Sequence, residues 1–254
     1  IGGLISVCLA QAHKGDPKNN LVSVFSKKNI KRIFDKSIWD KILPLQTKPK
    51  YDGKGKRNVI SEHLLVKTMG ELCVKTAVVA YDIEQEETKV FRSWEDNKTS
   101  LLDICDATSA APVYFPAVKV DGNWYIDGGV SANTPCLIGY AEAVKLWGRD
   151  ADIRILSIGT GKERVRKLGK ETRGWGLPEW MIYGRFVDIA MDAPRDVMWK
   201  CCKDIIPEGK FLRINGEVKV LYTDDTSDDF RKVLEERATE VFNENKDTIK
   251  DFLK

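Results

Sequence analysis

Histidine is nearly absent from this 254-residue sequence, which contains only His13 and His63. In α/β-hydrolases the catalytic residues follow one another along the chain as serine, acid and histidine. No histidine follows residue 63, so a triad in this order with Asp127 as its acid is excluded. For His13 and His63 we predict surface or packing roles.

Long hydrophobic runs and linkers are missing as well. Apolar runs such as "TAVVAY" (76–81) fall far short of the ~18 residues that a membrane-spanning helix needs. No stretch rich in proline, glycine or serine divides the chain, so we predict one domain over residues 1–254. The small formal net charge of +3 and the lack of a base-reading motif argue against nucleic acid as a partner.

The cysteines lack the spacing of a metal site. None of the six forms a C-x-x-C pair, and no histidine lies near them at ligand spacing. We therefore predict no metal, and reduced thiols in a cytoplasmic protein. The adjacent Cys201 and Cys202 could be redox active, although nothing around them in the sequence requires it. The apolar first residues have no basic leader and do not predict a signal peptide.

What the sequence does contain is an alternation of strand-like and helix-like segments. "KTAVVAYDIEQEETKVFRSW" (75–94) predicts two strands joined by an acidic turn, and "DIRILSIGTG" (152–161) predicts a strand buried on both faces. Helices are predicted over residues 1–14, 131–147 and 228–254. This order indicates an α/β fold with a mainly parallel central sheet flanked by helices.

The stretch "YIDGGVSANTP" (125–135) presents a carboxylate where a predicted strand ends. Two glycines allow unusual backbone conformations and keep side chains away from Asp127, which suits a catalytic carboxylate and an ordinary strand-to-helix turn alike. Ser131 follows so closely that we predict a helix-capping role for it rather than a nucleophilic one. Ser109 is expected in a packed turn.

Several stretches together resemble the patatin-like phospholipase family. They are "DATSAAPVYFPAV" (106–118), "YIDGGVSANTP" (125–135) and "ILSIGTG" (155–161), preceded by "KPKYDGKGKRNVISEHL" (48–64). The resemblance implies a three-layer α/β/α fold and a serine–aspartate dyad that needs no histidine. It implies that Asp127 is the dyad acid, that Gly128 and Gly129 complete a D-G-G motif, and that no metal or organic cofactor is used.

The nucleophile of this family lies in a G-x-S-x-G elbow between a strand and a helix. Ile1 fits the second variable position of such an elbow and Gly2 fits its last glycine. The resemblance therefore places the serine immediately before residue 1 and the glycine-rich oxyanion loop earlier still. On this interpretation residues 1–254 lack both elements and are expected to be inactive alone.

The function implied by the resemblance is hydrolysis of fatty-acyl esters of membrane lipids, as in a phospholipase A. Two alternatives stay open: a catalytically silent lipid-binding or regulatory module, and a lipase effector switched by a protein or small nucleotide at the basic surface of residues 27–57. Cations Arg164, Arg166 and Lys167 precede the aromatic residues of 175–186. This pattern is typical of peripheral contact with an anionic membrane. It is equally typical of a helix that buries its aromatic face and follows a solvent-exposed basic segment.

Overall fold

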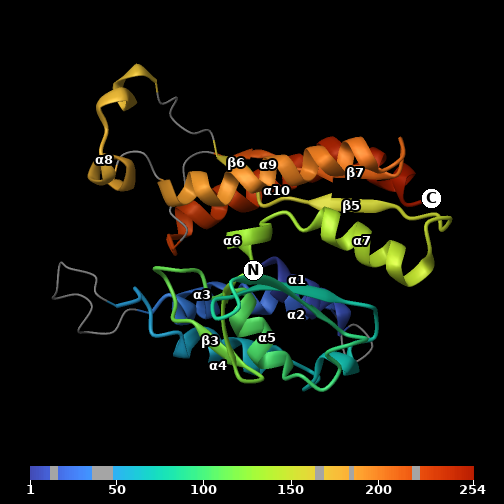
Figure 1. The fold of residues 1–254 in the computed structure, drawn as a ribbon, viewed down its shortest axis with the longest axis horizontal. Helices are drawn as coiled ribbons and strands as arrows, with labels where there is room; N and C mark the ends of the chain where they lie inside the picture. The colour runs from blue at the N-terminus through green and yellow to red at the C-terminus, as the bar shows by residue number, and fades with distance from the viewer. Residues whose placement is uncertain (12–16, 36–47, 164–168, 183–185, 219–223) are drawn as a thin grey trace. The chain divides into compact units, whose positions relative to one another are not determined.

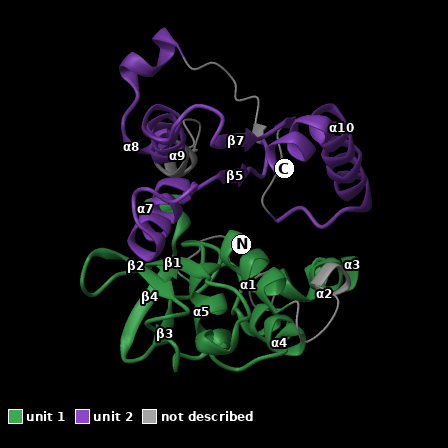
Figure 2. Ribbon diagram, turned by 90° about the vertical axis from the view of Figure 1, so that its right-hand side faces the viewer, with its two compact units in different colours: residues 1–132 green, residues 133–254 purple. Residues whose placement is uncertain are grey.

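The computed structural model describes the chain except for residues 12–16, 36–47, 164–168, 183–185 and 219–223 (Figure 1). The described residues form two compact units, Ile1–Ala132 and Asn133–Lys254, which Figure 2 shows in different colours. Both contain helices and strands, so the predicted α/β class is confirmed. That the two units form one patatin-like domain stays a prediction.

The first unit is built around a four-stranded sheet in the order β2-β1-β4-β3. Its strands are β1 (Ala77–Asp82), β2 (Glu87–Arg92), β3 (Val118–Val120) and β4 (Asn123–Asp127). Every pairing in it is antiparallel, whereas mainly parallel pairing was expected. For two of the three pairings the reason is local: β1–β2 and β3–β4 are joined by turns of a few residues, and parallel neighbours would need a long crossover connection.

The turn between β3 and β4 reverses the direction of the chain, so that β4 pairs antiparallel with β3. Asp121 and Gly122 both have positive φ, 47° and 104°. Positive φ at both central residues is the geometry of the two-residue hairpin turn that matches the twist of the strands, and Asp-Gly is a preferred pair there. This turn sets the register of β4, which ends at Asp127 opposite Ala80 of β1.

Helices of the first unit share one hydrophobic core with the sheet. They are α1 (Gly2–Ala10), α2 (Pro17–Val24), α3 (Lys27–Ile33), α4 (Lys54–His63), the short 3₁₀ helix η3 (Met69–Glu71), α5 (Leu101–Thr108) and α6 (Gly129–Ala132). On β1, Val78, Ala80 and Asp82 are buried and the alternate residues are half-buried. Helices α1 and α5 pack against β1, so the buried face of the strand is the one under these helices.

The second unit pairs its strands in parallel. Strand β5 (Ile155–Ile158) pairs with β7 (Phe211–Ile214), and β6 (Lys162–Glu163) pairs with β8 (Glu217–Val218). The expectation that β5 is buried on both faces is wrong for the described residues, since Ile158 is 75% exposed. The helices are α7 (Cys136–Trp147), η4 (Lys170–Gly174), α8 (Leu177–Ile182), α9 (Phe186–Ile205) and α10 (Asp228–Phe252). Among the described residues no helix has the length and apolar character to cross a bilayer.

Candidate active site

Asp127 lies at the end of β4, where three segments far apart in the sequence meet. Its backbone pairs with Ala80 on β1. Its N–H donates to the carbonyl oxygen of Ala110, at 3.0 Å, in the segment that follows α5. The carboxylate is therefore carried by backbone that is fixed on two sides.

One oxygen of the Asp127 carboxylate is anchored locally. Oδ1 accepts a hydrogen bond from the N–H of Gly129 at 2.7 Å, in the first turn of α6. Within the part of the chain that the structure describes, Oδ2 has no hydrogen-bond or ion-pair partner, and the residue is half-buried. A carboxylate held through one oxygen keeps the other free to accept a proton.

Gly128 is required by packing rather than by an unusual backbone angle. A Cβ at this position would lie 2.3 Å from the carbonyl oxygen of Val79. Positive φ occurs at other glycines of the described chain and not at Gly128. The missing side chain lets the turn after Asp127 lie directly on β1.

The first turn of α1 lies close to the turn after Asp127. A Cβ on Gly3 would lie 2.7 Å from Val78 Cγ1 and 2.8 Å from the hydroxyl of Thr108. That hydroxyl donates to the carbonyl oxygen of Val79 at 2.6 Å, the same oxygen against which Gly128 packs. The start of α1 and the turn after Asp127 are thus neighbours through Val79.

Neither serine close to Asp127 in the sequence has the surroundings of a nucleophile. Ser131 lies inside α6, and its hydroxyl donates to the carbonyl oxygen of Gly128 at 3.4 Å. The capping role expected for Ser131 is wrong, because the helix begins two residues earlier. Ser109 is buried and donates to the carbonyl oxygen of Cys105 at 2.7 Å, as a packed turn requires.

A buried ion pair that the sequence analysis missed supports the loop beside Asp127. Lys56 is 3% exposed, its Nζ donates to the carbonyl oxygen of Asp106 at 2.7 Å, and it lies 3.0 Å from the Asp106 carboxylate. Burial lowers the pKa of Lys56, while Asp106 and, more weakly, Asp127 act in the opposite direction. Lys56 thereby ties the end of α5, and the segment that contacts Asp127, to α4.

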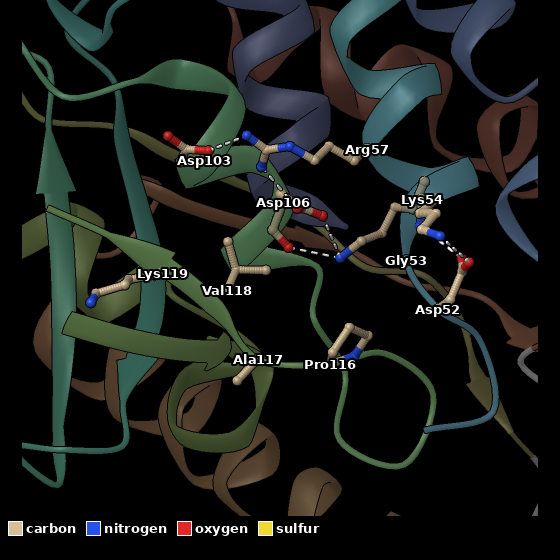
Figure 3. Close-up of a pocket in the computed structure, with 11 residues that line it drawn as sticks. Asp52, Gly53, Lys54, Arg57, Asp103, Asp106, Pro116, Ala117, Val118 and Lys119 are labelled. Atoms are coloured by element: carbon tan, nitrogen blue, oxygen red, sulfur yellow. Dashed lines mark hydrogen bonds and ion pairs between the residues drawn. The ribbon is translucent and has the colours of Figure 1, made fainter. Parts of the chain in front are cut away.

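Charged side chains line a cavity of about 340 Å³ next to this pair (Figure 3). Arg57 spans Asp103, at 2.5 Å, and Asp106, at 3.1 Å, and Lys54 faces Asp52. Because these cations already have carboxylate partners, the cavity is best interpreted as the solvent-facing side of a structural ion network. Arg57 and Asp106 lie in stretches that resemble the family, but only the fold brings them together.

The predicted packing role of His63 agrees with its contacts. Its Nδ1 donates to the carbonyl oxygen of Val59 at 2.8 Å, and its Nε2 lies 2.9 Å from the hydroxyl of Ser23. His63 in this way joins α4 to α2. His13 lies outside the described residues. Among the described residues no group of three potential metal ligands comes together.

The stretch proposed to contact membranes is described only in part, since Arg164, Arg166 and Lys167 lie outside the described residues. Beyond them, Trp175 and Trp180 pack edge to face with ring centroids 5.4 Å apart. Between them Leu177 at the start of α8 is 75% exposed. Both the membrane and the packed-helix interpretations stay open.

Comparison with known proteins adds a family match. Residues 1–140 match the patatin-like phospholipase family. Patatin-like protein 2 of Arabidopsis thaliana is 31% identical over 218 residues, covering 72% of this chain and 54% of that protein. A cGAMP-activated phospholipase of Pseudomonas aeruginosa is 28% identical over 200 residues, covering 76% and 59%. A potato protein (Solanum tuberosum) named "Probable inactive patatin-3-Kuras 1" is 30% identical over 161 residues, covering 52% and 43%. The chain spans about half the length of the curated relatives that it matches.

Proposed function

Because the chain belongs to the patatin-like phospholipase family, we propose that the intact protein is a lipid acyl hydrolase that uses Asp127 as its general base. The observation that carries the proposal is the geometry of Asp127. Its carboxylate is anchored through Oδ1 by Gly129, and Oδ2 has no partner among the described residues. The start of α1 is linked to the same turn through Thr108, whose hydroxyl donates to the Val79 carbonyl oxygen on which Gly128 packs.

This arrangement supports a dyad whose serine stands immediately before Ile1 in the intact protein. A nucleophile at that position would lead into α1 as an elbow serine leads into its helix. Asp127 would accept the serine proton as the oxygen attacks the ester carbonyl, and an acyl-enzyme would form. Water activated by the same carboxylate would then release the fatty acid.

Two alternatives remain beside this proposal. A silent lipid-binding module is suggested by the relative named inactive, and a switched lipase is suggested by the relative named cGAMP-activated. For the second, the described part of the basic surface includes the exposed Lys27, Lys28 and Lys31 of α3. Ester turnover by the full-length protein, measured with and without added cyclic dinucleotide, distinguishes a constitutive hydrolase from a lipase switched by a nucleotide.

Asp127→Asn in the full-length protein tests the dyad directly. The amide has nearly the shape of the carboxylate and can still accept from Gly129, but it cannot take the serine proton. Removal of a general base costs ~10²–10⁴-fold in turnover, and with no histidine contacting Asp127 among the described residues we expect the upper end. Turnover is measured on a fluorogenic phospholipid in mixed micelles.

Asp150→Asn serves as the matched control, because this exposed aspartate lies outside the candidate site. It should retain full activity, and circular dichroism should show that both variants are folded. Undiminished turnover in Asp127→Asn would exclude the dyad. No turnover in the wild-type full-length protein, on any phospholipid class and with any nucleotide, would contradict the proposed hydrolase and leave the silent module or a lipase switched by a protein.

A further inference from the structure

Two buried cysteines face each other in the second unit. Cys136 is the first residue of α7, and Cys202 lies near the end of α9. Their sulfur atoms are 2.9 Å apart, and the thiol of Cys202 donates to that of Cys136. With Ile206 they form the centre of a small core, packed against half-buried Tyr140 and Trp199. Both residues are free thiols in the structure.

We propose that Cys136 and Cys202 are a reversible disulfide site, oxidised by a peroxide or by a small-molecule disulfide. The proposal concerns the second unit alone and does not depend on the lipid hydrolase proposal. The sequence drew attention to the adjacent Cys201 and Cys202, but adjacent residues of a helix point in different directions. The fold instead brings together two cysteines 66 positions apart.

The geometry leaves little movement for bond formation. A disulfide bond is about 2.05 Å long, so the two sulfurs would approach by about 0.9 Å from their present separation. Because both helices belong to one compact unit, the pair is held in contact rather than meeting by chance.

The two thiols differ in their readiness to react. Burial raises the pKa of Cys202 to about 12, so this residue remains a thiol at neutral pH. Cys136 is 8% exposed whereas Cys202 is completely buried, so a small oxidant reaches Cys136 first. The guanidinium of Arg213, whose pKa is lowered by burial, lies close enough for both cysteines to act on it electrostatically.

The reaction with hydrogen peroxide proceeds in two balanced steps. The Cys136 sulfur attacks one peroxide oxygen and the O–O bond breaks, which leaves Cys136 as a sulfenic acid. The departing hydroxide takes up the thiol proton of Cys136 and leaves as water. The Cys202 sulfur then attacks the Cys136 sulfur. The S–O bond breaks, and the departing hydroxide takes the Cys202 proton and leaves as a second water. Two thiols lose two electrons in total, and the peroxide gains them.

The test is oxidation of the folded wild-type chain with a stoichiometric excess of hydrogen peroxide, followed by alkylation under denaturing conditions. Two of the six cysteines should resist alkylation, and the intact mass should fall by ~2 Da, the mass of two hydrogens. Peptide mapping should find Cys136 linked to Cys202. Dithiothreitol should restore six alkylated cysteines.

Cys201→Ser is the matched control, because it removes the neighbouring thiol and leaves the pair intact. It should oxidise like the wild type, whereas Cys136→Ser and Cys202→Ser should lose the linked peptide. If either serine variant fails to fold, as judged by circular dichroism, the wild-type peptide map alone decides. Six alkylated cysteines after oxidation, a link between other cysteines in place of Cys136 and Cys202, or sulfinic acid as the main product would each overturn the proposal.

Discussion

Gly128 lies so close to the carbonyl oxygen of Val79 that a methyl group at this position would be 2.3 Å from it. Gly128→Ala should therefore push the turn after Asp127 away from β1. We expect a loss of ~1–3 kcal/mol in the free energy of unfolding, the usual cost of overpacking. Urea denaturation followed by circular dichroism measures the change.

Gly139→Ala is the control for this substitution. Gly139 lies inside α7 and has open space where its Cβ would be. Alanine favours a helix over glycine by ~0.5–1 kcal/mol, so Gly139→Ala should stabilise the protein slightly. Equal effects of the two substitutions would mean that Gly128 does not pack on Val79 as described.

At the same scale, the sequence predicted Asp127 and its glycines but not the residues that hold them. The D-G-G motif is local, so its residues could be recognised together. Lys56 and Asp106 are 50 positions apart. No feature of either stretch indicates that these two side chains form an ion pair. A buried lysine cannot be distinguished in sequence from the exposed lysines around it, because burial depends on the fold of distant segments.

At the scale of elements, Asp82 joins two hairpins of the first unit. Its carboxylate accepts from the N–H groups of Glu84 and Gln85 in the β1–β2 turn, both at 3.0 Å. It also accepts from the side-chain amide of Asn123 at the start of β4, at 2.9 Å. Burial favours the neutral acid, but these hydrogen bonds outweigh it and hold the pKa of Asp82 below its ordinary value.

We therefore predict that Asp82→Asn costs ~1–3 kcal/mol in the free energy of unfolding at pH 7, as expected when a buried charged acceptor is lost. A lowered native pKa means that the unfolded chain binds the proton more readily. The contribution of Asp82 is thus complete above the unfolded pKa of about 3.9 and is lost as the pH falls through the lower native value.

Urea unfolding of both proteins between pH 7 and pH 3 checks this prediction. The difference between wild type and Asp82→Asn should be constant down to about pH 4 and should shrink below it. The exposed Asp204→Asn is the control and should stay within ~0.5 kcal/mol of wild type. A difference that grows on acidification would contradict the assigned hydrogen bonds.

The elements themselves were predictable where their signals are local. The two strands of residues 75–94 and the Asp-Gly turn before β4 follow from alternation and turn chemistry. The direction in which β4 pairs with β1 does not, because residues of distant segments compete for the same strand edge and only the complete core selects among them. The expectation of a mainly parallel sheet was wrong for this pairing and for the two hairpins with short turns, although the α/β class was correct.

At the scale of the whole molecule, charge alone gives no strong attraction to a membrane. The formal net charge is +3, and the described part of the proposed contact balances Lys170 and Arg173 with Glu171 and Glu179. Membrane binding would therefore have to come from a local patch that combines apolar side chains with nearby cations. Trp175, Leu177 and Trp180 are the described apolar members of such a patch.

We predict that vesicles containing anionic lipid bind the protein through this patch. Sedimentation with such vesicles should weaken as salt rises, because exposed charges are screened within ~10 Å at 0.1 M. The double substitution Trp175→Ala and Trp180→Ala should reduce binding at every salt concentration, since it removes the aromatic part of the contact. Trp147→Ala is the matched control. Trp147 is 61% exposed at the end of α7, outside this patch, so its substitution should leave vesicle binding unchanged. Equal binding by both variants would support the alternative in which the two tryptophans only pack against each other.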